Sequence, residues 1–119
     1  MASPTPEVSA LRRALEAGDV LVTTGLILQE LLQGFAGPRA RKAIIERFTS
    51  LPFLNPDRQD HIYAAELRNR CRRAGLQIGT IDALLAQLCV RHALTLLTTD
   101  KDFVRVAMQC PLRLWQPAG

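Results

Sequence analysis

The sequence predicts an α/β fold built in layers around a largely parallel β-sheet. Short apolar and β-branched runs alternate with runs of helical length from residue 20 to the end of the chain, which is the pattern of strand–helix units. Hydrophobic residues make up 48% of the chain and charged residues 22%, as in ordered globular proteins. A length of 119 residues fits one domain, so we expect a single domain over residues 1–119.

The first part of the chain predicts three helices and one strand. Residues 7–17 are amphipathic and follow a Ser-, Thr- and Pro-rich entry, so they predict a helix. Residues 20–23 are a β-branched run between turn residues, typical of a buried strand. Residues 25–35 are apolar on nearly every side, which predicts a buried helix. After Gly37 and Pro38 the pattern is again that of an amphipathic helix.

The middle of the chain predicts an edge strand and a long helix. Residues 51–56 contain two prolines, which suit a strand at the edge of a sheet. Residues 57–73 form an amphipathic helix, and we interpret Asp57 and Asp60 as surface acids at its start. Its predicted apolar positions are Ile62, Ala65, Leu67 and Cys71.

The last part of the chain predicts a helix, a strand, a short helix and a final strand. Thr80 is the expected N-cap of the almost wholly apolar helix 81–92. Residues 94–98 follow as a strand, 103–108 as a short helix and 112–115 as the last strand. We find no internal repeat and no Gly-rich phosphate-binding motif.

The formal net charge of +4 permits a nucleic-acid partner but does not require one. Nearly all the basic residues are Arg, whose planar fork of donors suits phosphate. A genome of biased base composition explains an excess of Arg over Lys equally well. The densest basic cluster closes the predicted helix 57–73, where the helix dipole favours cations, so we expect a solvated helix end. The cluster consists of Arg68, Arg70, Arg72 and Arg73.

The cysteines and histidines predict neither disulfides nor a zinc site. Cys71, Cys89 and Cys110 are odd in number and widely spaced, and His61 and His92 are isolated from them. Cys89 lies in an apolar helical run and predicts a small core residue. The start of the chain lacks the features of a signal peptide, and no apolar run reaches membrane-spanning length. We therefore expect a cytoplasmic protein.

Four acidic residues stand out from the rest. Glu30 lies within an apolar helix, where a carboxylate is costly to bury unless it is paired or binds a metal. Asp82 is in the first turn of a later apolar helix, and on its own it is explained by the stabilising effect of an acid at a helix N-terminus. Asp100 and Asp102 follow the strand 94–98; alone they fit a turn or a cap, although ligands of parallel sheets bind beyond such strand ends. We expect Asp82 to start near the opposite edge of the sheet unless its helix is short or the start of the helix folds over the sheet, so local geometry does not by itself bring Asp82 to Asp100.

Three runs of the sequence together are similar to the acidic motifs of a known family. They resemble, in order, spacing and apolar context, the successive motifs of PIN-domain ribonucleases, above all VapC-type toxins, from about residue 6 to residue 115. Each motif alone is weak, and the series is specific. The runs are Ile27-Leu28-Gln29-Glu30-Leu31-Leu32-Gln33-Gly34, Gly79-Thr80-Ile81-Asp82-Ala83-Leu84-Leu85-Ala86 and Leu96-Leu97-Thr98-Thr99-Asp100-Lys101-Asp102-Phe103.

The resemblance implies a PIN-like three-layer sandwich and a metal-dependent endoribonuclease. Glu30, Asp82 and Asp100 would be catalytic carboxylates that hold Mg²⁺ or Mn²⁺, Asp102 an accessory metal ligand, and Thr98 a residue that orients a carboxylate or water. Oxygen ligands do favour such hard cations. The resemblance also implies an RNA substrate, a cognate antitoxin and a homodimer. An Asp-x-Asp phosphatase motif is the competing interpretation of Asp100 and Asp102, but it normally lies at the first strand of its fold.

One departure from the family pattern bears on activity. Relatives begin with a central apolar strand that ends in Asp-Thr-Ser, and this sequence has no counterpart. We therefore expect an N-terminally truncated domain that lacks its first strand and first metal ligand, through a start codon placed downstream, deliberate shortening or decay of the gene. The first is favoured, because the other motifs are intact. The expected function is the endoribonuclease toxin of a VapBC-type pair. The alternative is a catalytically deficient remnant that only binds an antitoxin or oligomerises.

Overall fold

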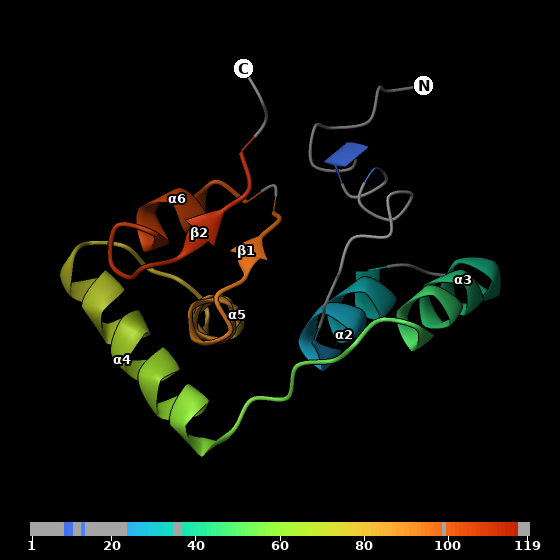
Figure 1. The fold of residues 1–119 in the computed structure, drawn as a ribbon, viewed down its shortest axis with the longest axis horizontal. Helices are drawn as coiled ribbons and strands as arrows, with labels where there is room; N and C mark the ends of the chain where they lie inside the picture. The colour runs from blue at the N-terminus through green and yellow to red at the C-terminus, as the bar shows by residue number, and fades with distance from the viewer. Residues whose placement is uncertain (1–8, 11–12, 14–23, 35–36, 99, 117–119) are drawn as a thin grey trace. The chain divides into compact units, whose positions relative to one another are not determined.

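The structure is a computed structural model, and it describes residues 9–10, 13, 24–34, 37–98 and 100–116 (Figure 1). The predicted strand 20–23 lies outside these residues, as does most of the predicted helix 7–17. Residue contacts divide the chain into two units. We call Ala14–Asn55 the helical unit, and Met1–Arg13 with Pro56–Gly119 the sheet unit. The prediction of a single domain stays a prediction.

In the described part of the helical unit, α2 (Gly25–Gly34) and α3 (Pro38–Thr49) lie in contact, and both confirm the predicted positions. The chain enters α3 through Gly37, whose φ of 107° suits glycine, and Pro38 supplies the fixed φ that favours a first helical residue. The apolar side of α3 is half-buried rather than buried. Its last turn closes locally, because the Thr49 hydroxyl donates to the carbonyl of Ile45 at 2.8 Å.

The predicted edge strand 51–56 is wrong. Within that stretch only Phe53 has a bridge conformation, and the rest is turn or loop. Two prolines remove the N–H donors that a ladder needs, and the N–H of Leu51 donates instead to the carbonyl of Phe48. The Phe53 ring meets the Phe48 ring edge to face, with centroids 6.5 Å apart, so this segment is fixed by side-chain packing.

The sheet unit is built on two packed helices, α4 (Arg58–Arg73) and α5 (Thr80–Arg91). Helix α4 ends in a Schellman motif: Gly75 has φ +83°, and the N–H of Leu76 donates to the carbonyl of Cys71 at 2.8 Å. The buried apolar side chains that the structure describes lie in this unit. They are Ala64, Leu67, Cys71, Leu76, Ile78, Ala83, Leu84, Ala86, Leu88, Phe103, Val106 and Leu112.

Two details of these helices differ from the prediction. On α4, Leu67 and Cys71 are buried as expected, but Ile62 is 44% exposed and Ala65 is exposed as well. The buried stripe runs instead through Asp60, Ala64, Leu67 and Cys71, at the i, i+4, i+7 and i+11 spacing of one helical face. A pattern based on hydrophobicity alone does not detect this buried face, because one of its four residues, Asp60, is an acid. Helix α5 is capped by Gly79, and Thr80 is its first residue rather than its cap.

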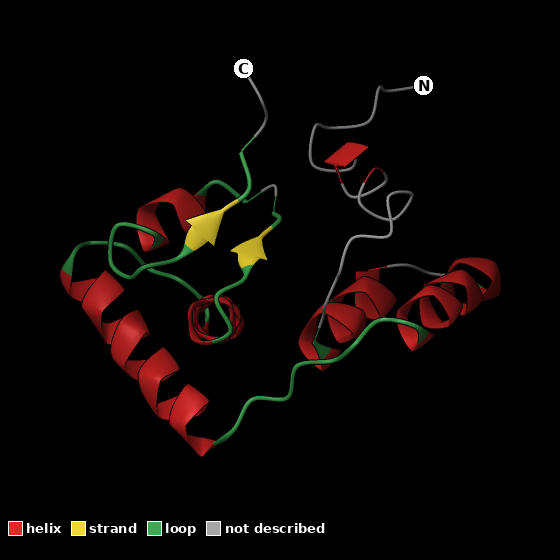
Figure 2. Cartoon of the chain, viewed as in Figure 1, coloured by secondary structure: helices red, strands yellow, loops and turns green. Residues whose placement is uncertain are grey.

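The described part of the sheet is one parallel pair of strands, β1 (Thr95–Leu96) and β2 (Arg113–Leu114), drawn as adjacent yellow arrows in Figure 2. Thr95 aligns with Arg113 and Leu96 with Leu114, and the N–H of Trp115 extends the ladder to the carbonyl of Leu96. Both strands are shorter than predicted. The short helix α6 (Asp102–Val106) forms part of the crossover between them.

Candidate functional site

The best-defined acidic feature is the turn that joins β1 to α6. The N–H of Asp100 donates to the Thr98 hydroxyl at 3.1 Å, and the Asp100 carboxylate accepts the N–H of Asp102 at 2.9 Å. The side chains of Asp100 and Asp102 are both exposed. The Thr98 hydroxyl therefore fixes the backbone of Asp100, and the backbone N–H of Asp102 orients the carboxylate of Asp100. The structure brings these two predicted site residues together just beyond the carboxyl end of a parallel strand.

Asp82 lies in the first turn of α5 and is half-buried. The N-cap residue Gly79 has no side chain, and the Asp82 carboxylate stands in the first turn, where the helix dipole favours negative charge. Helix α5 leads directly into β1 and contacts it. Asp82 and Asp100 therefore belong to the same unit, Asp82 in the first turn of a helix–strand segment and Asp100 after the end of that segment.

Glu30 lies on α2 in the helical unit, and its side chain falls outside the described part of the structure. Among the described residues no three His, Cys, Asp or Glu side chains lie close enough together to hold a metal ion. The joint site of Glu30, Asp82, Asp100 and Asp102 thus remains a prediction.

The interpretation of Asp57 and Asp60 as surface acids is wrong for Asp60. Its side chain is fully buried, and the two residues form a reciprocal capping box at the start of α4. The N–H of Asp60 donates to Asp57 at 2.9 Å, and the N–H of Asp57 donates to Asp60 at 3.0 Å. The three-residue spacing of the two acids before an amphipathic helix was the sequence signal for this arrangement.

Helix α5 completes the environment of Asp60. The Gln87 amide donates to the Asp60 carboxylate at 3.4 Å, and the Arg91 guanidinium forms a hydrogen-bonded ion pair with the same carboxylate. A guanidinium nitrogen of Arg91 also lies 3.3 Å from a carboxylate oxygen of Asp57. Burial raises the pKa of Asp60, but the hydrogen bonds from Asp57, Gln87 and Arg91 outweigh it and hold the pKa below its ordinary value. Asp60 therefore stays ionised and joins α4 to α5.

The basic end of α4 is only partly the solvated surface that we expected. The Arg68 side chain donates to the carbonyl of Ile78 at 2.9 Å, and Arg70 donates to the carbonyl of Gln109 at 2.7 Å. Both bonds satisfy backbone groups in segments remote in sequence. They fix the loop before α5 and the turn after α6 to the end of α4.

The three cysteines are free and have packing roles. Cys71 is buried, while Cys89 is half-buried rather than fully in the core. Burial raises the pKa of the Cys89 thiol to about 11, and it raises the pKa values of Cys71 and Cys110 as well. Such thiols are protonated at neutral pH, which is the opposite of an activated nucleophile.

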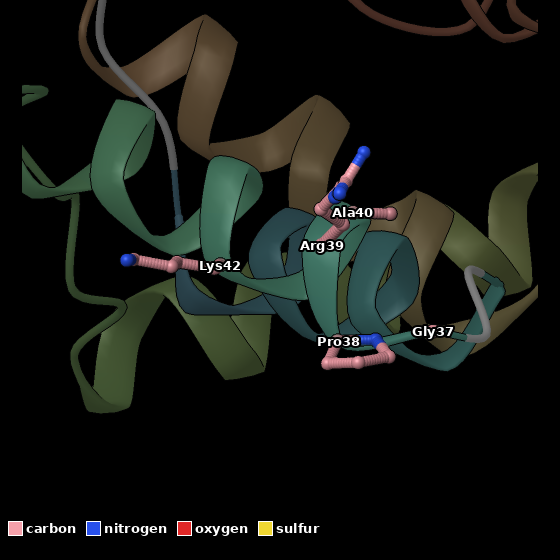
Figure 3. Close-up of a pocket in the computed structure, with 5 residues that line it drawn as sticks. All are labelled: Gly37, Pro38, Arg39, Ala40 and Lys42. Carbon is pink, nitrogen blue, oxygen red and sulfur yellow. The ribbon is translucent and has the colours of Figure 1, made fainter.

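An open hollow of about 600 Å³ lies at the start of α3, separate from the acidic turn in sequence (Figure 3). Its lining includes Arg39 and Lys42, whose side chains extend in different directions. The predicted site residues whose side chains the structure describes, Asp82, Asp100 and Asp102, do not line it. We therefore do not place the candidate site there.

Comparison with known families decides the identification. The family model of the PIN domain matches residues 1–108, which is most of the chain. The chain belongs to the PIN-domain family. This PIN domain is similar to a chain in the crystal structure of VapBC2 from Rickettsia felis bound to a DNA fragment from their promoter. The TM-score is 0.72 at 23% identity, over 93% of this chain and 85% of that chain.

These findings confirm the predicted PIN-like α/β fold. The identity is low enough that the similarity to the Rickettsia felis chain concerns the fold alone. No curated protein matches the sequence. In the part of the PIN domain that the structure describes, no helix is long and apolar enough to cross a membrane.

Proposed function

We propose that this PIN domain is a metal-dependent endoribonuclease and the toxin of a VapBC-type toxin–antitoxin pair. The family match over residues 1–108 carries the proposal, because it spans all three acidic motifs of the sequence. The fold likeness to a chain of a VapBC complex supports the toxin assignment over other PIN-domain roles. The same likeness motivates a cognate antitoxin as the partner, and a homodimer is proposed from the family resemblance.

Glu30, Asp82 and Asp100 are the proposed catalytic metal ligands, with Asp102 as an accessory ligand. Carboxylate oxygens fit Mg²⁺ or Mn²⁺, and no thiolate or imidazole is needed. Such an ion, when bound, supplies an activated water and offsets negative charge on the scissile phosphate. The contribution of the described residues is orientation, since Thr98 and the backbone of Asp102 fix Asp100 from both sides.

RNA cleavage by the purified chain tests this proposal. Mn²⁺-dependent cleavage is expected, with loss on chelation and in each of the variants Glu30→Gln, Asp82→Asn and Asp100→Asn. Glu46→Gln is the matched control, because Glu46 is an exposed acid of α3 with only a long 4.0 Å ion pair to Lys42. It should cleave as the parent does.

Two results would contradict the proposal in different ways. Undiminished cleavage by Asp100→Asn would show that the assigned site is wrong. A chain that binds an antitoxin but leaves RNA intact would be the non-catalytic module that the sequence left as the alternative.

A further inference from the structure

Two cations, Lys101 and Arg105, flank the acidic turn with no partner in the described structure. Both side chains are exposed. Neither takes part in an ion pair or a side-chain hydrogen bond among the described residues. Each is therefore available to a ligand at the solvent face of the turn.

Several other cations of the sheet unit are already engaged. Their side chains donate hydrogen bonds to backbone carbonyls or, in one case, to the buried carboxylate of Asp60, which leaves fewer donors for a ligand. The engaged residues are Arg68, Arg70, Arg91 and Arg113, which bond to Ile78, Gln109, Asp60 and Ala93 respectively. Arg58 and Arg73 of this unit are likewise exposed and outside these bonds, so what distinguishes Lys101 and Arg105 is their place in the sequence beside Asp100 and Asp102.

Backbone geometry places the two cations one helical turn apart. Lys101 has helical angles, φ −70° and ψ −17°, and the N–H of Val104 donates to its carbonyl at 3.1 Å. Residues four apart on such a turn project to the same side, with Cβ atoms about 5–6 Å apart. Phe103 and Val106 face the other way and are buried, which anchors the turn. The cations are held at a defined spacing beside Asp100 and Asp102.

A site of carboxylates repels a polyanionic strand, so a nuclease needs positive charge beside its acids. We propose that Lys101 and Arg105 bind phosphates of the RNA backbone adjacent to the one that is cleaved. The inference rests on the proposed function and assigns substrate-positioning residues to that site. These contacts go to phosphates, so they set the position of the strand without selecting its sequence.

Binding of a fluorescein-labelled single-stranded RNA to the full chain, without divalent ions, tests the inference apart from catalysis. Anisotropy titrations over a series of salt concentrations give both affinity and the number of phosphates contacted. Lys101→Gln/Arg105→Gln should weaken binding by about tenfold at moderate salt and reduce the slope of log K against log salt by roughly 1.4, since each phosphate on a single strand contributes about 0.7.

The matched control is Arg47→Gln/Arg58→Gln, which removes the same charge from exposed helix positions distant from the turn in sequence. It should bind within about twofold of the parent, because general charge loss acts weakly at moderate salt. Lys101→Arg/Arg105→Lys keeps both charges and should retain the parent slope. Equal melting temperatures of all variants would establish that folding is unaffected.

An unchanged slope in Lys101→Gln/Arg105→Gln would overturn the inference while leaving the nuclease proposal standing. So would an equal loss in the control pair, since that would reflect net charge alone. If the parent chain binds no RNA at all, the inference and the proposed function fail together. Weaker binding of an antitoxin peptide, with RNA binding unchanged, would reassign the two cations to a protein partner and overturn the RNA assignment.

Discussion

The buried carboxylate of Asp60 on α4 is paired with the guanidinium of Arg91 on α5, in the unit that also carries Asp82 and Asp100. Arg91 reaches this acid from the last turn of α5, and Gln87 binds it from one turn earlier. Two consecutive turns of α5 are thus fixed to the start of α4. The pair sets the position of the helix whose first turn bears Asp82.

Replacing Arg91 with Gln should destabilise the protein by about 3 kcal/mol, because it leaves the Asp60 carboxylate buried without its counter-charge. Urea unfolding followed by circular dichroism gives the free energy of unfolding. The exposed Arg58, which has no such partner in the described structure, is the control. Its change to Gln should stay within about 0.5 kcal/mol. Equal effects at both positions would mean that the buried pair contributes nothing.

Stability should fall at acidic pH in a way that depends on Asp60. Its pKa in the folded state lies below the unfolded value, so the unfolded chain binds the proton more readily. The stabilisation is present above the ordinary Asp pKa, about 3.9, and is lost as pH falls through the lower folded value. The urea midpoint of the parent should therefore drop below about pH 4 more steeply than that of Asp60→Asn. Parallel curves would contradict this assignment.

Gly75→Ala should cost about 1 kcal/mol of stability, because its φ of +83° disfavours any residue with a Cβ. A Cβ there meets nothing within 4 Å, so the cost comes from the backbone alone. Gly25→Ala is the opposite case: its Cβ also meets nothing, but the site is helical and Ala should stabilise by several tenths of a kcal/mol. Thermal melts of the two variants should shift in opposite directions.

Thr98→Val should slow RNA cleavage by roughly tenfold while leaving the fold intact, since it removes one hydrogen bond that holds the backbone of Asp100. Cleavage rates at saturating Mn²⁺ provide the measurement. Thr98→Ser keeps the hydroxyl and should restore most of the rate. Thr95→Val, at an exposed position of β1, should have no effect. If Thr98→Val cleaves at the parent rate, the hydroxyl does not serve the site.

Much of the helical framework could be predicted from the sequence, because it depends on local signals. Gly37-Pro38 before α3 and the apolar run of α5 are examples, and each was located to within a few residues. The strands were overestimated, since strand pairing depends on distant partners that a local pattern does not contain. The edge strand around Phe53 failed for that reason.

The candidate site likewise has a part that depends on local sequence and a part that depends on long-range packing. The turn that joins Thr98, Asp100 and Asp102 involves residues close in sequence, and the structure shows it directly. The joint placement of Glu30 and Asp82 with it requires long-range packing, so it stays a prediction. Asp60 was misinterpreted because its burial depends on Gln87 and Arg91, which lie on another helix. An acid near a helix start has the same local pattern whether or not such a helix covers it.

The shortness of β1 and β2 has a consequence for how the site tolerates change. In the part of the sheet that the structure describes, the ladder pairs only two residues of each strand, whereas Phe103 and Val106 of α6 are buried in the core. The position of Asp100 thus depends more on the packing of α6 than on the pairing of the two strands. We expect substitutions in the strands to leave Asp100 and Asp102 in place, and a change of side-chain volume at Phe103, which directly follows Asp102, to displace both.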